Sequence, residues 1–121
     1  MIINDDVFNV VKTIKDNSIS LIFCDPPYNM GTKYSIDLTT GKPHTKDAKD
    51  FMNNKWDGLT CEQIETFFKE SFRIAKYGAY IVLYGIDRVQ MPWEYFSLMA
   101  GFEPQQYLYS YKISSFPKAS D

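Results

Sequence analysis

The stretch ISLIFCDPPY, residues 19–28, decides the fold of this chain. Its first six residues form a nearly unbroken apolar run, which is typical of a strand buried in a parallel sheet. A carboxylate, two prolines and an aromatic residue then end the strand. Each proline fixes its own φ, lacks a backbone N–H and restricts the residue before it. The stretch therefore predicts a stiff exit from a sheet that projects Asp25, the Pro26 carbonyl and the Tyr28 ring in fixed directions.

A short amphipathic helix is predicted before this stretch. Apolar residues recur there at helical spacing, at Val7, Val10, Val11 and Ile14. Asp6 is a candidate N-cap of this helix, because a short carboxylate side chain accepts hydrogen bonds from the first free N–H groups. Ile2 and Ile3 predict a short strand ahead of the helix.

Further helices and strands are predicted after residue 59. Thr60 and Gln63 form a capping box at the start of a helix, and Gly78 is its expected end. The apolar stripe of that helix is Ile64, Phe67, Phe68, Phe72 and Ala75. A later helix carries Val89, Trp93, Phe96, Met99 and Ala100 and ends at Gly101. Strands are predicted at residues 79–84 and 105–112.

The alternation of strands and helices predicts the fold class. Strands joined by helical crossovers favour an α/β chain whose strands are mostly parallel, with flanking helices. In such sheets ligands bind beyond the carboxyl ends of the strands, and Asp25 follows one such end. We therefore expect a functional site at Asp25.

Residues 29–58 show no sustained period and carry several glycines and polar residues. We predict a long loop inserted after the strand, with one helical turn near residues 46–52. Positive charge gathers in this loop between Lys33 and Lys55. A solvated loop is the simpler explanation. The alternative is that Lys33 and its neighbours contact phosphates beside a functional site.

Composition bounds the class of protein. The chain has 121 residues, of which 45% are hydrophobic and 17% aromatic, as expected of one globular domain or part of one. Its apolar runs are too short to span a membrane, and its start does not resemble a signal peptide. Cys24 and Cys61 lack metal-ligand spacing and His44 is the only histidine, so we expect a reduced cytoplasmic protein without a metal site. A net charge of −2 excludes DNA binding by overall charge alone.

The residues of the strand exit suit one kind of chemistry. An exocyclic amine of a nucleobase is a poor nucleophile, because its lone pair is delocalised into the ring. Two acceptors on its two N–H groups favour a pyramidal nitrogen, and the Asp25 carboxylate and Pro26 carbonyl are acceptors of that kind. Tyr28 offers a surface for stacking, worth about 1–3 kcal/mol per base. In duplex DNA such a base must first be flipped out.

A simpler explanation is that Asp-Pro-Pro only ends a strand, since both residue types are common in turns. The buried strand before the segment and Asn29 after it favour a functional site.

The chain resembles the amino-methylating DNA methyltransferases, which modify adenine N6 or cytosine N4 with S-adenosylmethionine. Asp25, Pro26, Pro27 and Tyr28 match the catalytic motif of this family, and the Asp form is more typical of adenine N6 enzymes. Residues 3–29 are similar to the family's opening segment, and residues 78–85 to its next core strand. Gly101-Phe102 resembles a later block, which continues with Tyr111-Lys112 where the family more often has Trp-Lys.

The resemblance implies a set of site residues. The four motif residues are the expected catalytic group in a Rossmann-like methyltransferase sheet. Asp6 and Asp25 are the expected cofactor contacts, although Asp6 also suits a plain helix cap. Tyr28, Asn29, Lys33 and Trp56 are the expected contacts to DNA, although Trp56 also suits the core.

The order of the motifs resembles the permuted group of this family, in which the catalytic motif comes first. In that group the cofactor loop Phe-x-Gly-x-Gly comes later, and this sequence contains no Gly-x-Gly. The resemblance therefore implies that residues 1–121 are the catalytic part of the domain, without the cofactor loop or target-recognition region. Such a part is expected to self-associate or bind a complementary methyltransferase chain, because the innermost strand keeps an unpaired edge. The alternatives are a non-catalytic or remnant domain and an enzyme acting on cytosine N4.

Overall fold

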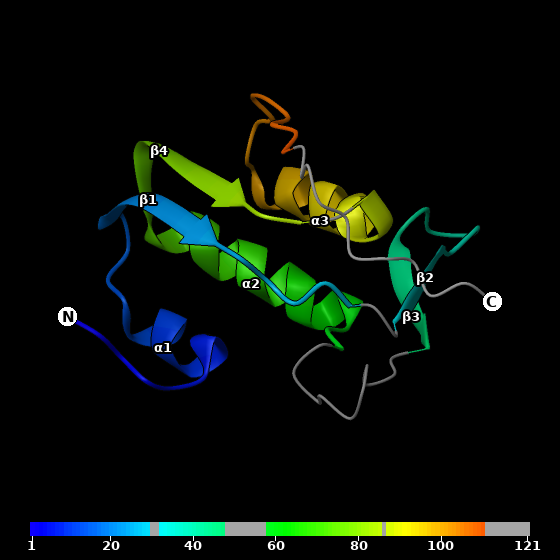
Figure 1. Ribbon diagram of the computed structural model, residues 1–121, viewed down its shortest axis with the longest axis horizontal. Coiled ribbons are helices and arrows are strands. Elements are labelled where there is room, and N and C mark those ends of the chain that lie inside the picture. The colour runs from blue at the N-terminus through cyan, green and yellow to red at the C-terminus, as the bar shows by residue number, and fades with distance from the viewer. Residues whose placement is uncertain (30–31, 48–57, 86, 111–121) are drawn as a thin grey trace.

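The computed structural model of the chain describes residues 1–29, 32–47, 58–85 and 87–110, which form a mixed α/β fold (Figure 1). In chain order the elements are α1 (Val7–Thr13), β1 (Ile19–Cys24), β2 (Lys33–Ile36), β3 (Pro43–Asp47), α2 (Cys61–Ile74), β4 (Ala75–Leu83) and α3 (Asp87–Ala100). Two separate sheets are present among these residues, the parallel pair β1–β4 and the antiparallel hairpin β2–β3.

The parallel sheet contains the strand predicted at residues 19–24, and β1 has those bounds. Phe23 pairs with Val82 and Cys24 with Leu83, and α2 lies within the crossover that joins the two strands. Figure 1 shows the two arrowheads pointing the same way. The carboxyl ends of β1 and β4 therefore lie next to each other.

The capping box of α2 is confirmed. The Thr60 side chain accepts a hydrogen bond from the Gln63 N–H at 3.3 Å, and the Gln63 side chain accepts one from the Thr60 N–H at 2.8 Å. Both N–H groups would otherwise lack partners at the helix start. The cap fixes where α2 begins and so where its apolar face points.

An aromatic core joins α2 to α3. Phe67, Phe68 and Trp93 meet in edge-to-face contacts, with ring centroids between 5.4 and 5.8 Å apart. Ile64 and Phe68 are fully buried, as the helical stripe predicts. Cys24, Ile81 and Leu83 of the parallel sheet pack against this cluster. The core therefore lies between one face of the sheet and the two long helices.

The predicted end of α2 at Gly78 is wrong. The helix ends at Ile74, and Ala75 is both its C-cap, with ψ 135°, and the first residue of β4. Gly78 lies inside β4 with φ +76°. Ala75 pairs with Ile19 of β1, so β4 begins at the residue that directly follows the last residue of α2. Phe72, placed on the buried stripe, is 47% exposed.

The helix α1 is confirmed, with Asp6 as its N-cap accepting from the Phe8 N–H at 2.8 Å. Arg73 of α2 binds its far end, donating to the carbonyls of Val11 and Ile14 at 2.9 Å each. The same guanidinium pairs with Asp16 and Glu70. Arg73 thus satisfies C-terminal carbonyls of α1 and fixes that helix to α2.

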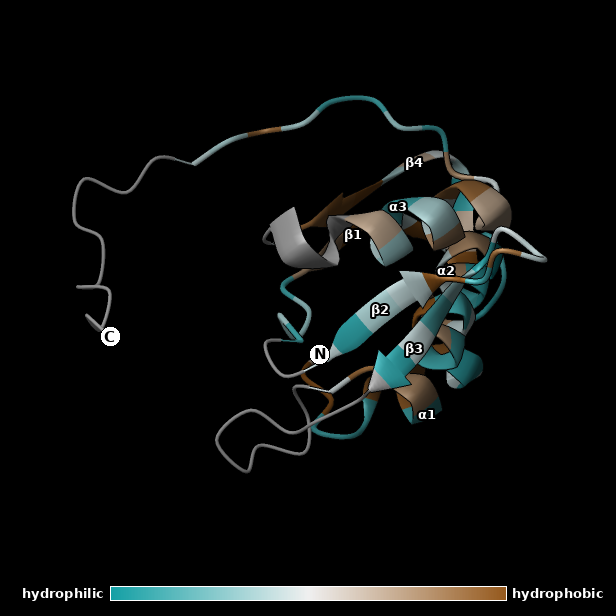
Figure 2. Ribbon diagram, turned by 90° about the vertical axis from the view of Figure 1, so that its right-hand side faces the viewer, coloured by the Kyte–Doolittle hydropathy of each residue, from teal (hydrophilic) through white to brown (hydrophobic). Residues whose placement is uncertain are grey.

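The strand predicted at Ile2 and Ile3 is absent, since both residues are exposed coil. The segment 105–110 also forms no strand, and residues 111–112 of that prediction lie outside the described residues. Figure 2 shows the chain after α3 as an irregular segment, and the Tyr107 hydroxyl in it donates to the Glu94 carboxylate of α3 at 2.8 Å. A strand needs a hydrogen-bonding partner, and no described residue pairs with this segment.

The long loop contains a hairpin that the sequence analysis missed. β2 and β3 pair across a turn in which the Asp37 side chain accepts from the N–H groups of Thr39 and Thr40. Gly41 closes this turn with φ +69°, which favours glycine. The helical turn predicted near residues 46–52 is wrong for residues 46 and 47, which belong to β3, and its remainder lies outside the described residues. Figure 2 shows the hairpin as mostly hydrophilic.

The expectation that β1 is covered on both faces is also wrong for the residues described. Ile22 and Cys24 are half-buried, whereas Leu21 and Phe23 on the opposite face are 57% and 69% exposed. Tyr80 of β4, which pairs with Leu21, is exposed as well. Helix packing therefore covers one face of the parallel sheet. The longest described helices, α2 and α3, have 14 residues each, too few for a helix that crosses a bilayer.

Candidate functional site

The candidate site lies at the carboxyl edge of the parallel sheet. Asp25 directly follows β1 and is exposed, whereas Pro26 is buried and Pro27 and Tyr28 are half-buried. Pro26 therefore anchors the strand exit in the protein while the carboxylate beside it faces solvent. The four motif residues lie where open α/β sheets bind ligands.

The Tyr28 phenol and the Asp25 carboxylate interact directly. Burial raises the pKa of Tyr28, and a hydrogen bond to Asp25 and the charge of that carboxylate raise it further. The phenol of Tyr84 adds a smaller contribution in the same direction. Tyr28 therefore remains protonated throughout the neutral range, with its phenol close to the Asp25 carboxylate.

Asn29 holds the strand exit against the start of α2. Its side chain is 3% exposed, and its Oδ1 accepts a hydrogen bond from the Leu59 N–H at 2.7 Å. Its backbone has φ +51°, a region that Asn tolerates better than most residues, and its carbonyl accepts from the Thr32 N–H at 2.9 Å. The structure thus places this predicted DNA contact inside the protein, directly after Tyr28.

The chain has two cysteines, of which Cys24 precedes Asp25 and Cys61 lies in the core. Cys24, next to Asp25, has a raised pKa because it is buried and because the Asp25 charge opposes ionisation. Burial also raises the pKa of Cys61. Both cysteines are free thiols, and both are held in the unreactive protonated form at neutral pH.

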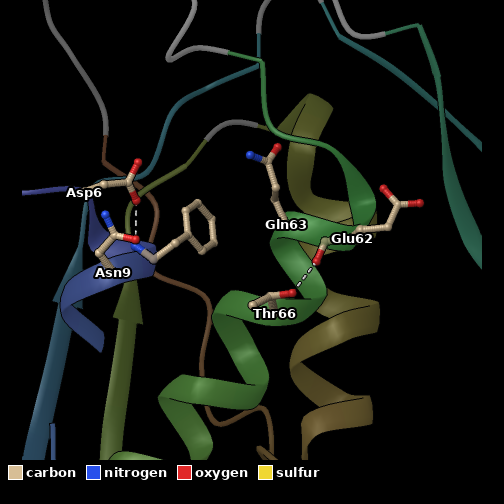
Figure 3. Close-up of a pocket in the computed structure, with 6 residues that line it drawn as sticks. Asp6, Asn9, Glu62, Gln63 and Thr66 are labelled. Carbon is tan, nitrogen blue, oxygen red and sulfur yellow. Dashed lines mark hydrogen bonds between the residues drawn. The ribbon is translucent and has the colours of Figure 1, made fainter. Parts of the chain in front are cut away.

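Asp6 lines a separate open pocket of about 360 Å³ between α1 and α2. Figure 3 shows Asp6 and Asn9 on α1 across from Gln63 and Thr66 on α2. One carboxylate oxygen of Asp6 accepts from the Phe8 N–H, and the other makes no hydrogen bond with the described residues. This pocket is at the lower end of the usual size of ligand sites, and the motif residues do not line it.

Lys33 and Trp56 are the remaining predicted contacts to DNA. Lys33 is exposed at the start of β2, in register with Asp47 of β3. Trp56 lies outside the described residues. Within the described ranges, no group of three or more His, Cys, Asp or Glu side chains is arranged to hold a metal ion.

Tyr84 is a site residue that the sequence analysis missed. It follows β4, and its N–H donates to the Cys24 carbonyl at 2.9 Å, next to Asp25. The available signal was its position as the last residue of the run AYIVLY. Aligning the carboxyl ends of the two predicted strands would have placed Tyr84 beside the motif.

Comparison of the chain with protein-family models gives no match, and comparison with curated proteins gives none either. The fold and the candidate site describe the chain as follows. It is a mixed α/β chain with a parallel strand pair, whose carboxyl edge carries the exposed Asp25, the buried Pro26 and the half-buried Tyr28, with Tyr84 following the neighbouring strand.

Proposed function

We propose that this chain is the catalytic part of a DNA methyltransferase that modifies adenine N6 with S-adenosylmethionine. The observation that carries the proposal is the exposed Asp25 carboxylate, which follows a parallel strand and adjoins the buried Pro26. The fold is compatible with part of a Rossmann-like sheet, because α2 connects two parallel strands as a crossover.

The proposed roles of the motif residues follow from their chemistry. The Asp25 carboxylate and the Pro26 carbonyl each accept one N–H of the adenine amine, which directs the nitrogen lone pair outward. The Tyr28 ring stacks on the base after it is flipped out of the duplex. The Tyr28 phenol interacts with the Asp25 carboxylate, so the groups proposed to stack on the base and to orient its amine lie close to each other.

Asn29 is proposed to position the motif. A buried side chain whose oxygen is committed to the Leu59 N–H suits this role better than a direct contact with the base. Lys33 and Trp56 remain proposed DNA contacts on the loop that follows, with Lys33 suited to a phosphate.

The residues around Asp6 fit the adenosine end of S-adenosylmethionine. The second carboxylate oxygen of Asp6 is a solvent-facing acceptor for a hydroxyl or amine, and Asn9, Gln63 and Thr66 add polar groups to the same pocket. S-adenosylmethionine, when bound, supplies an electrophilic methyl group on its sulfonium. Asp25 is the proposed contact at the reacting end, because it lies at the strand edge.

A second candidate function is a domain that contributes assembly or nucleic-acid contacts without catalysis. The 121 residues contain no Gly-x-Gly, the element that holds the cofactor in the family that the chain resembles. A cofactor loop would then have to come from a partner chain of different sequence. The cytoplasm is the proposed compartment for either function, because both cysteines are free thiols.

Calorimetric titration of the 121-residue chain with S-adenosylmethionine tests the cofactor part of the proposal. We expect saturable binding that is weakened about tenfold in Asp6→Asn, the loss of one charged hydrogen bond. Asn is as good an N-cap as Asp, so this variant keeps α1 while removing the free acceptor oxygen. Equal affinity for both proteins contradicts the role of Asp6.

Methyl transfer to unmodified DNA, followed by digestion to nucleosides, tests the reaction. N6-methyl-2′-deoxyadenosine as the product supports the proposal, whereas N4-methyl-2′-deoxycytidine shows that the chain methylates cytosine instead. Asp25→Ala should abolish the product. Asp37→Ala, which removes a carboxylate in the hairpin turn, should leave it unchanged. Full transfer by Asp25→Ala contradicts the assignment.

A further inference from the structure

Tyr84 and the motif occupy neighbouring strand ends. Leu83 pairs with Cys24, and the Tyr84 N–H extends the pairing one step further by donating to the Cys24 carbonyl at 2.9 Å. The residue that follows Cys24 is Asp25. Tyr84 therefore lies beside Asp25 at the edge toward which both arrows point in Figure 1.

The Tyr84 side chain is available to a ligand. It is 44% exposed. Tyr28 is less exposed, since it is half-buried, and its phenol interacts with the Asp25 carboxylate. The two phenols are near enough to interact electrostatically, so a half-buried ring and an exposed ring lie at the same edge of the sheet.

We infer that Tyr84 is a second aromatic contact for the target base, packing on the base while Asp25 and Pro26 hold its amine. The inference rests on the proposed function and extends its site to β4. A base that leaves the duplex loses the stacking on both of its faces, and one tyrosine replaces only one of them. A ring on the adjacent strand end supplies a contact for the second face, and the hydrogen bond to Cys24 fixes the backbone that carries this ring.

The test measures the affinity that the base itself contributes. The full 121-residue chain is titrated by fluorescence anisotropy with two labelled single strands of the same thymine-rich sequence, one with a central adenine and one with an abasic site there. A single strand requires no flipping, so the comparison isolates contacts to the base. The ratio of the two dissociation constants is the readout.

We expect Tyr84→Ala to weaken binding of the adenine strand by about tenfold and to leave binding of the abasic strand unchanged, as stacking on an aromatic side chain predicts. Tyr84→Phe keeps the ring and should keep the ratio. Tyr84→Leu keeps the apolar bulk without the ring, and the ratio of the two dissociation constants should fall in it as it does in Tyr84→Ala. This variant separates stacking from packing if the alanine variant folds poorly.

Tyr80→Ala is the matched control. Tyr80 lies on β4, the strand that Tyr84 follows, and is 61% exposed. It pairs with Leu21, further from Asp25, so its removal should leave the ratio unchanged. If Tyr84→Ala keeps the wild-type ratio of dissociation constants while Asp25→Ala binds both strands equally, the inference is overturned and the proposed function stays intact. A wild-type chain that binds both strands equally overturns the proposed base site and the inference with it.

Discussion

Asn29 makes two separate contributions to stability, and the chain supplies a control for each of them. Its φ of +51° is shared with Asn17, whose side chain is exposed in the turn after α1. Only Asn29 also accepts a hydrogen bond from a part-buried N–H, that of Leu59. Substitutions at both positions therefore separate backbone strain from the hydrogen bond.

Asn29→Ala should lower the free energy of unfolding by about 2–4 kcal/mol. A left-handed conformation costs Ala about 1 kcal/mol, and leaving the Leu59 N–H without a partner costs about 1–3 kcal/mol. Asn17→Ala bears only the first cost. Asn29→Gly relieves the strain but loses the hydrogen bond, whereas Asn17→Gly should be close to neutral.

Urea unfolding followed by the fluorescence of the buried Trp93 measures these differences. A difference of about 2 kcal/mol between Asn29→Gly and Asn17→Gly moves the unfolding midpoint by about 1 M urea. Equal midpoints for the two glycine variants would refute the reasoning, because the bond between Asn29 and Leu59 would then contribute nothing. The comparison requires that the free energy of unfolding depend on urea concentration with the same slope in both variants.

Three further predictions concern the core, the thiols and the sheet edge. Phe68→Ala, which empties a fully buried site, should cost about 3–5 kcal/mol in urea unfolding, whereas Phe72→Ala on the same helix, at a site 47% exposed, should cost less than half as much. Burial raises the pKa of Cys24 and Cys61 above their ordinary value of 9.0, so their contribution to stability should be complete below about pH 9 and lost as pH rises through the raised pKa; ultraviolet thiolate absorbance that appears below pH 9 in the folded chain contradicts this. The isolated chain should self-associate or have a low melting temperature, because β1 pairs on one side only among the described residues. A monomer by light scattering that also has a high melting temperature contradicts this.

Local signals in the sequence predicted the elements that depend on neighbouring residues. The capping box of Thr60 and Gln63 and the cap at Asp6 involve contacts within three residues, so the pattern alone specifies them. The strand β1 was predicted with correct bounds, because an apolar run that ends in two prolines has few alternatives.

Features that depend on distant partners were missed. Glycine is typical of a helix end, so Gly78 was predicted to end α2. The helix ends earlier because Ala75 already pairs with Ile19 of β1. The segment 105–110 has strand-forming residues but pairs with no described residue. For the site, the motif gave Asp25 and Tyr28, but the position of Tyr84 beside them depends on the register between two strands.

The bonds of Arg73 have a kinetic consequence. They join residues that lie 59 and 62 positions apart in the chain, and the pairing of β1 with β4 spans a similar separation. A helix of seven residues is marginal alone, so α1 should form only once the end of α2 is in place. Contacts of such long sequence separation slow folding, because the loop between them must close first. We therefore expect the edge that carries Asp25 to be assembled late, after α2 and α3 have formed their aromatic core.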